Sequence, residues 1–122
     1  MIREQGRLIF DSAQAEYTVG SRAGVTSDRS LSFRSENLSV DLVICADASP
    51  LRVMHGQVVH EMGDRPVTLA SVRLGDEGEA VQTDEHGQFA VSTLASDSTQ
   101  FLWIDTPEEQ VLCSIPPTGK QR

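Results

Sequence analysis

Aromatic side chains are scarce in this sequence: phenylalanine, tryptophan and tyrosine together supply 5% of its 122 residues. Its core must therefore be built mainly from valine, leucine and isoleucine, and few rings remain to line a carbohydrate site. Long apolar runs are also missing, so no segment approaches the roughly 20 residues of a membrane-spanning helix. The polar opening of the chain is followed only by Leu8-Ile9-Phe10, which is too short for the core of a signal peptide. We therefore expect a cytoplasmic protein that binds no membrane.

Basic residues are outnumbered by acids, 10 against 18, which gives a net charge of −8. This balance argues against nucleic acid as a partner, because binding of phosphates requires a positively charged surface. The charge is uneven: residues 1–44 carry 5 arginines and 6 acids (−1), whereas residues 45–122 carry 5 basic residues and 12 acids (−7). The acidic part is either a solvated surface that keeps a β protein soluble or a surface for a basic partner.

Cysteine is limited to Cys45 and Cys113. Two cysteines cannot establish a disulfide framework, and the cytosol keeps thiols reduced. We expect both side chains to be free thiols, buried on strands.

Motifs of catalysis and metal binding are also missing. No G-x-S-x-G nucleophile turn is present, and His60-Glu61 is not followed by the second histidine of H-E-x-x-H. The remaining histidines, His55 and His86, form no tetrahedral set with His60. We therefore predict a protein that is not an enzyme, with no catalytic residues, no metal ligands and no cofactor. Calcium prefers carboxylates from loops, and one cluster of acidic residues could supply them, although their spacing is not that of an EF-hand. This cluster consists of Asp76, Glu77, Glu79, Asp84 and Glu85.

The chain does contain a strong alternation of apolar and polar residues, centred on residues 53–94. Alternation over a few residues is typical of a half-buried strand. Met54, Gly56 and Val58 share one face of the first such strand, and Phe89 and Val91 share one face of the last. Residues 75–78 and 84–87 are rich in the residue types that favour turns. The stretch therefore predicts four short strands separated by turns.

Five residues of this stretch have clear structural uses. Gly56 lets another backbone or a large side chain pack against its strand. Pro66 fixes φ where a strand begins, and Phe89 is the expected central core residue. Asp84 can accept hydrogen bonds from the amides of its own turn, which Gly87 can end in the left-handed conformation.

Further strands are expected at residues 7–10, 15–19, 31–34, 38–45, 99–105 and 110–115, with a loop at 20–30. The run Phe101-Leu102-Trp103-Ile104 makes the 99–105 segment apolar on both faces, as in a central, covered strand. We expect the rings of Phe101 and Trp103 in the core; the alternative is that Trp103 anchors a partner. No amphipathic helix is predicted.

These patterns predict an all-β fold: a Greek-key β-sandwich of about seven to nine antiparallel strands, transthyretin- or immunoglobulin-like. A single domain spans residues 1–122. Its most regular module covers about 51–115, the strands within 7–45 complete the sheets, and 116–122 form a tail.

The module resembles a known family on specific residues, namely Gly56-Gln57-Val58, Pro66-Val67, Ala70, Val72, Leu74, Thr83-Asp84, Gly87, Phe89 and Leu94. This pattern is similar to that of the carboxypeptidase regulatory-like domains of the transthyretin-like β-sandwich superfamily. Leu69 stands where the family usually has a glycine, and Asp97-Ser98-Thr99 replaces its proline-glycine-aromatic step. The resemblance implies a non-catalytic accessory module.

Our functional hypothesis is a protein–protein interaction or regulatory module of a bacterial cytosolic system. Short copies of such domains with an opening like Arg7-Leu8-Ile9-Phe10 accompany sigma factors or CHAT-type protease modules, which implies a link to either. The alternative is a β-sandwich that binds carbohydrate or calcium.

The predicted contact surface is a loop or a free sheet edge. We place the edge on the N-terminal strands, where Arg7, Arg29 and Arg34 could meet carboxylates of a partner or of a second copy. Alternatively, these arginines are only solvated.

Overall fold

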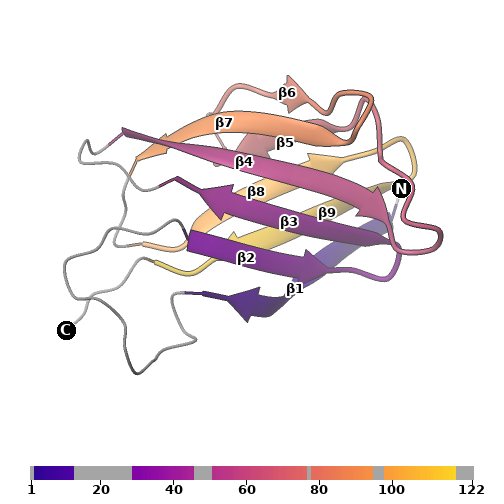
Figure 1. Ribbon diagram of the computed structural model, residues 1–122, viewed down its shortest axis with the longest axis horizontal. Coiled ribbons are helices and arrows are strands. Elements are labelled where there is room, and N and C mark those ends of the chain that lie inside the picture. Colours follow the sequence, from indigo (N-terminus) through magenta and orange to yellow (C-terminus); the bar gives the residue numbers. More distant parts are fainter. Residues whose placement is uncertain (1, 13–28, 46–50, 77, 95–97, 118–122) are drawn as a thin grey trace.

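The computed structural model describes residues 2–12, 29–45, 51–76, 78–94 and 98–117. All regular structure in these ranges is β, as the alternation predicts (Figure 1). The strands are β1 (Ile2–Asp11), β2 (Arg29–Arg34), β3 (Leu38–Ile44), β4 (Leu51–His60), β5 (Ser71–Leu74), β6 (Val81–Gln82), β7 (Gln88–Leu94), β8 (Gln100–Asp105) and β9 (Glu109–Ile115). The strand predicted at 15–19 and most of the loop at 20–30 lie outside the described residues.

The nine strands are hydrogen-bonded in the order β6-β5-β8-β9-β1-β2-β3-β4-β7. β1 belongs to both layers, because its first half pairs with β9 and its second half with β2, with a register shift between Leu8 and Phe10. An irregularity of this kind bends a strand and lets it pass from one layer to the other. Figure 1 shows β2, β3 and β4 in front of β8 and β9, so two layers face each other.

One pairing differs from the antiparallel arrangement that the sequence predicts. β1 and β9 run parallel, with Ile2 opposite Glu109 and Gly6 opposite Cys113. Parallel neighbours need a long connection. Here the connection spans residues 12–108, because β1 and β9 are the first and last of the described strands.

The N-terminal strands complete the sheets but are not an edge, so that part of the prediction is wrong. β1 lies between β9 and β2, and β2 lies between β1 and β3. The strand order ends instead at β6 and at β7. Both of these strands belong to the C-terminal module.

The core lies between the two layers and is formed by alternate residues of the paired strands. Phe33 is the largest fully buried side chain. The alternation predicted for β4 is present, and β3, the strand expected at 38–45, alternates in the same way. The inward side chains of both strands are buried: Leu38, Val40, Leu42, Met54 and Val58. The opposite layer contributes Val72, Leu102, Ile104, Val111, Cys113 and Ile115.

β8 is central in its sheet, but only one of its faces is covered. Phe101 is 44% exposed, and Trp103 is half-buried on the same outer face. The guanidinium carbon of Arg73 lies 6.0 Å from the centroid of the Trp103 ring, within reach of a cation–π contact. The predicted core position of both rings is therefore wrong, because a two-layered fold buries only the facing side of each sheet.

The two cysteines are free thiols. Cys113 is buried on β9, and its burial raises the pKa of the thiol to about 12. Cys45 is half-buried at the end of β3.

Candidate interaction surface

Arg29 is one of the three predicted contact residues, and unlike the other two it is buried. Its side chain is buried where β2 begins and binds the carboxylate of Asp11 at the end of β1. Nε lies 3.0 Å from Oδ1 and Nη2 lies 2.6 Å from Oδ2, a two-pronged ion pair. Loss of either partner would leave a buried charge, so the pair holds β1 and β2 together rather than meeting a partner.

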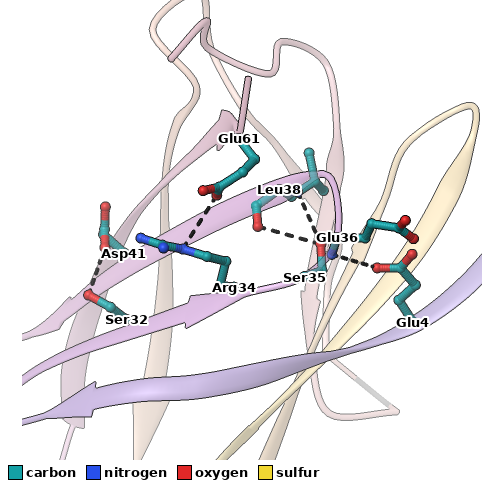
Figure 2. A network of polar contacts seen from close by, with 8 residues as sticks. All are labelled: Glu4, Ser32, Arg34, Ser35, Glu36, Leu38, Asp41 and Glu61. Atoms are coloured by element: carbon teal, nitrogen blue, oxygen red, sulfur yellow. Dashed lines mark hydrogen bonds and ion pairs between the residues drawn. The ribbon is translucent and has the colours of Figure 1, made fainter. Parts of the chain in front are cut away.

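Arg7 and Arg34 lie opposite each other on the outer face of β1 and β2, and both are exposed. Like charges in this position repel. Arg34 turns toward Glu61, with its Nε 3.4 Å from Oε1 (Figure 2). The structure therefore brings Arg7 and Arg34 together and separates them from Arg29.

Figure 2 also shows how the β2–β3 turn next to Arg34 is held. The Leu38 amide donates to Oγ of Ser35 (3.1 Å), and the Glu36 amide donates to Oε1 of Glu4 (3.0 Å). These hydrogen bonds lie within the fold and stabilise the conformation of the turn.

The turn before β7 is held by Asp84. Its Oδ1 accepts hydrogen bonds from the amides of His86 (2.8 Å) and Gln88 (2.9 Å). Both bonds stabilise the ionised carboxylate, that of Gln88 most, and hold the pKa of Asp84 below its usual value of 3.8. Gly87 follows with a φ of 75°. Its carbonyl accepts a hydrogen bond from the Val58 amide (2.8 Å), which fixes where β7 begins.

Pro66 and Gly56 place the neighbouring segments. Pro66 forms an isolated bridge with Val59, and the Val67 amide donates to the Val58 carbonyl (2.9 Å). Gly56 lies opposite Phe89 in the β4–β7 ladder. A Cβ at position 56 would overlap the Phe89 ring, so the missing side chain of Gly56 is what gives this ring its place.

The histidines and acids do not gather. In the described ranges, no group of three or more histidine, cysteine or acidic side chains could hold a metal ion. His55 lies on the outer face of β4, and Nε2 of His86 is 3.4 Å from the Glu85 carboxylate. Asp76, Glu79, Asp84 and Glu85 are all exposed.

Glu109 is the one acid of the β8–β9 turn that is buried, at 5% exposure. Burial raises the pKa of its carboxyl above the usual value, although a hydrogen bond with the Asn37 side chain acts in the opposite direction. Its Oε1 has no hydrogen-bond partner among the described residues. A hollow of about 320 Å³ adjoins it, lined by Asn37, His60, Met62, Arg65 and Glu108.

β7 is the strand that the fold leaves open. In the described structure it pairs with β4 alone. Because the Val58 amide bonds the Gly87 carbonyl, the alternation of an antiparallel ladder directs the backbone groups of Phe89 and Val91 toward β4. The N–H and C=O groups of Ala90 and Ser92 then point away from β4, and both residues are exposed.

Two adjoining hollows run along this free side of β7, between it and β5. One, of about 320 Å³, is lined by Leu74, Gly78, Glu79, Val81, Ala90, Val91 and Ser92. The other, of about 420 Å³, is lined by Leu74, Gly75, Ser92, Thr93, Thr99, Gln100 and Phe101. They share Leu74 and Ser92, and together we call them the β5–β7 groove. A side-chain hydrogen bond joins β8 to β7 beside the larger hollow, from Nε2 of Gln100 to Oγ1 of Thr93 (2.9 Å).

The sequence indicated this surface only through its charge. Residues 74–100 contain no lysine or arginine and six acids: Asp76, Glu77, Glu79, Asp84, Glu85 and Asp97. Nothing in the local pattern of β7 distinguishes an edge strand from an inner one.

In the part of the chain that the structure describes, no helix has the length and apolar character needed to cross a membrane. Comparison of the chain with protein-family models, with curated proteins and with solved structures finds no match.

Proposed function

We propose that this chain is a non-catalytic protein–protein interaction module whose contact surface is the free edge of β7. The observation that carries the proposal is the stretch of β7 at residues 90–92, which among the described strands pairs with β4 only and has a groove beside it; at Gln88 the same side of the strand is bonded to Asp84. Outward-pointing N–H and C=O groups are a template for an added strand, a common mode of peptide recognition.

The composition of β7 supports this use. Proteins usually protect an exposed edge with charged residues or proline, because an open edge pairs with other chains. The β7 sequence, Gln-Phe-Ala-Val-Ser-Thr-Leu, contains neither. An edge without such protection favours pairing with a further segment.

The biological setting is part of the proposal. We place the module in the cytoplasm of a bacterium, as a regulatory accessory of the carboxypeptidase regulatory-like type, linked to a sigma factor or a CHAT-type protease. One observation favours the family. Leu69, which occupies the position of the family's usual glycine, has a φ of 60°, a conformation that glycine adopts without strain.

A second candidate function is carbohydrate binding at the same groove. The exposed ring of Phe101 lines its larger hollow together with the polar side chains of Gln100 and Thr93. An aromatic surface beside hydrogen-bonding groups suits a sugar ring. Calcium has less support, because the described acids form no ligand group.

The test is affinity capture from the native cell with three proteins: wild type, Ser92→Pro and Ser92→Ala. Proline removes the outward N–H of Ser92 without removing a bond to β4, whereas alanine keeps it. A specific protein captured by wild type and Ser92→Ala, and lost from Ser92→Pro, supports the proposal.

Two outcomes argue against it. Retention by Ser92→Pro together with loss from an Arg7→Glu, Arg34→Glu variant would move the contact surface to β1 and β2. Absence of any protein partner, with saturable glycan binding by calorimetry that Phe101→Ala abolishes, would favour the carbohydrate function.

A further inference from the structure

Two exposed carboxylates lie at or beside the β5–β7 groove. Glu79 lines the groove, and Asp76 follows Gly75, which lines the larger hollow. Neither has an ion-pair partner among the described residues. The nearby Arg73 donates from Nη1 to the carbonyl oxygens of Gly75 and Asp76, each at 2.9 Å, and lies over Trp103 on the outer face.

The apolar part of the groove favours one kind of charged side chain. Leu74 and Val81 line the wall opposite β7, close to Glu79. A strand added to β7 directs alternate side chains toward this wall. Lysine and arginine can pack their aliphatic stems on apolar surface and place the charged group at a carboxylate beyond it. In this groove, Leu74 and Val81 would contact the aliphatic stem, and the Glu79 carboxylate would contact the charged group.

A second copy of this chain is a poor occupant. Pairing β7 with another β7 would bring together two surfaces whose described charges are those of Asp76, Glu79, Asp84 and Glu85, with no lysine or arginine in residues 74–100. Like charges across a strand pair repel. Charge complementarity therefore points to a basic segment of a different protein.

We infer that the β5–β7 groove receives an extended, cationic peptide segment of a partner protein, added as a strand to β7 with its lysine or arginine side chains over Leu74 and Val81. This inference rests on the proposed function and specifies the partner's chemistry. The backbone edge supplies the pairing, and the carboxylates of Glu79 and Asp76 supply the preference for positive charge.

The test uses three labelled, end-capped heptapeptides in which threonine alternates with lysine, glutamine or glutamate. Binding to the full chain is followed by fluorescence anisotropy, and the bound site by amide chemical shifts. We expect the lysine peptide to bind about tenfold more tightly than the glutamine peptide. The glutamate peptide should bind least, added salt should weaken the lysine peptide, and the shifts should centre on Ala90 and Ser92.

A matched pair of variants separates local from total charge. Asp76→Lys with Glu79→Lys changes the groove, and Glu36→Lys with Glu108→Lys makes the same change in net charge at exposed sites away from it. The groove variant should weaken the lysine peptide by about tenfold, and the control should leave it nearly unchanged. Equal weakening by both variants would overturn the inference, because it would show attraction to net charge alone.

The remaining outcomes distinguish the two proposals. If all three peptides bind equally and Ser92→Pro abolishes binding, edge recognition stands and the cationic preference is wrong. If the lysine peptide binds wild type and Ser92→Pro alike, the peptide does not pair with β7 and both proposals fail. If no peptide binds, the inference is wrong, and the capture experiment decides the function. A dimer in sedimentation that Ser92→Pro dissociates would assign the edge to a second copy.

Discussion

At the scale of single residues, Phe89 and Gly56 depend on each other. The Phe89 ring is 6% exposed and occupies space that any side chain at position 56 would need. Phe89→Ala should lower the free energy of unfolding by about 3–5 kcal/mol, because it leaves a cavity beside Gly56. Urea denaturation measures the change. Phe101→Ala, at a ring that is 44% exposed, is the control and should have a much smaller effect; equal losses would place Phe89 outside the core.

Gly87 and Gly75 have nearly the same backbone conformation, with φ of 75° and 77°. A Cβ at Gly75 would meet nothing within 4 Å, whereas a Cβ at Gly87 would overlap the Val58 carbonyl and press on Pro66. Gly75→Ala should therefore cost only the strain of the left-handed conformation, about 1–2 kcal/mol. Gly87→Ala should cost clearly more, as judged from thermal and urea unfolding. Similar losses at both positions would mean that the Asp84 turn is not packed against β4.

Leu69 is held in a conformation that disfavours it. Its φ is 60°, and its side chain is 70% exposed, so the strain is not offset by burial. Leu69→Gly should raise the free energy of unfolding by up to about 1 kcal/mol, since relief of the strain exceeds the entropy that glycine adds to the unfolded chain. Thr68→Gly, at an exposed neighbour with negative φ, should lower it instead. A loss of stability in both variants would contradict the strain at position 69.

At the scale of elements, the behaviour of β7 follows from its place at the end of the strand order. Proline substitutions test which backbone N–H groups of β7 are hydrogen-bonded to β4. Val91→Pro removes an N–H that faces β4 and should destabilise the protein by about 3 kcal/mol or more. Ser92→Pro removes an N–H that faces away from β4 and should cost far less. Chemical denaturation of both variants measures the difference, and circular dichroism checks the fold. A larger loss of stability in Ser92→Pro than in Val91→Pro would mean that Ser92, and not Val91, donates its N–H to β4.

The N-terminal strands show how the place of an element changes the role of its residues. β1 and β2 have neighbours on both sides, so their backbone groups serve the sheet. Arg29, at the junction with Asp11, then becomes a buried structural cation. Arg7 and Arg34 keep their exposed positions and serve as control sites for the β7 proposal.

At the scale of the whole molecule, stability depends on pH through Glu109. Because its pKa is raised above the usual 4.5, the folded state keeps a proton that the unfolded chain releases. The stability that this proton contributes is fully present below the unfolded pKa and is lost as the pH rises through the folded-state pKa. Glu109→Gln should therefore stabilise the protein above that pH and change little below it.

Thermal unfolding of wild type and Glu109→Gln from pH 4 to pH 8 measures this difference. Glu79 provides the control, because it is exposed and is not among the charges that shift the pKa of Glu109, so Glu79→Gln should leave the shape of the profile unchanged. A wild-type profile parallel to that of Glu109→Gln would contradict the assigned role of burial.

The sequence by itself determined the all-β class, the inward faces of β3, β4 and β7, and the turn at Asp84 and Gly87. These features depend on residues that are neighbours in the chain, and alternation, turn composition and the scarcity of long apolar runs report on them directly. The resemblance to a regulatory-like domain rests on the same local pattern.

Only the tertiary structure decided which strand is an edge, that β1 runs parallel to β9, that Arg29 is buried against Asp11 and that Trp103 lies on an outer face. Each depends on pairing between segments far apart in the sequence. Arg29 and Asp11 are 18 positions apart, and β7 is an edge only because no other described strand pairs with its far side. Strand order is set by the packing of the whole chain, and the alternation of apolar and polar residues within one strand does not depend on which strands lie beside it.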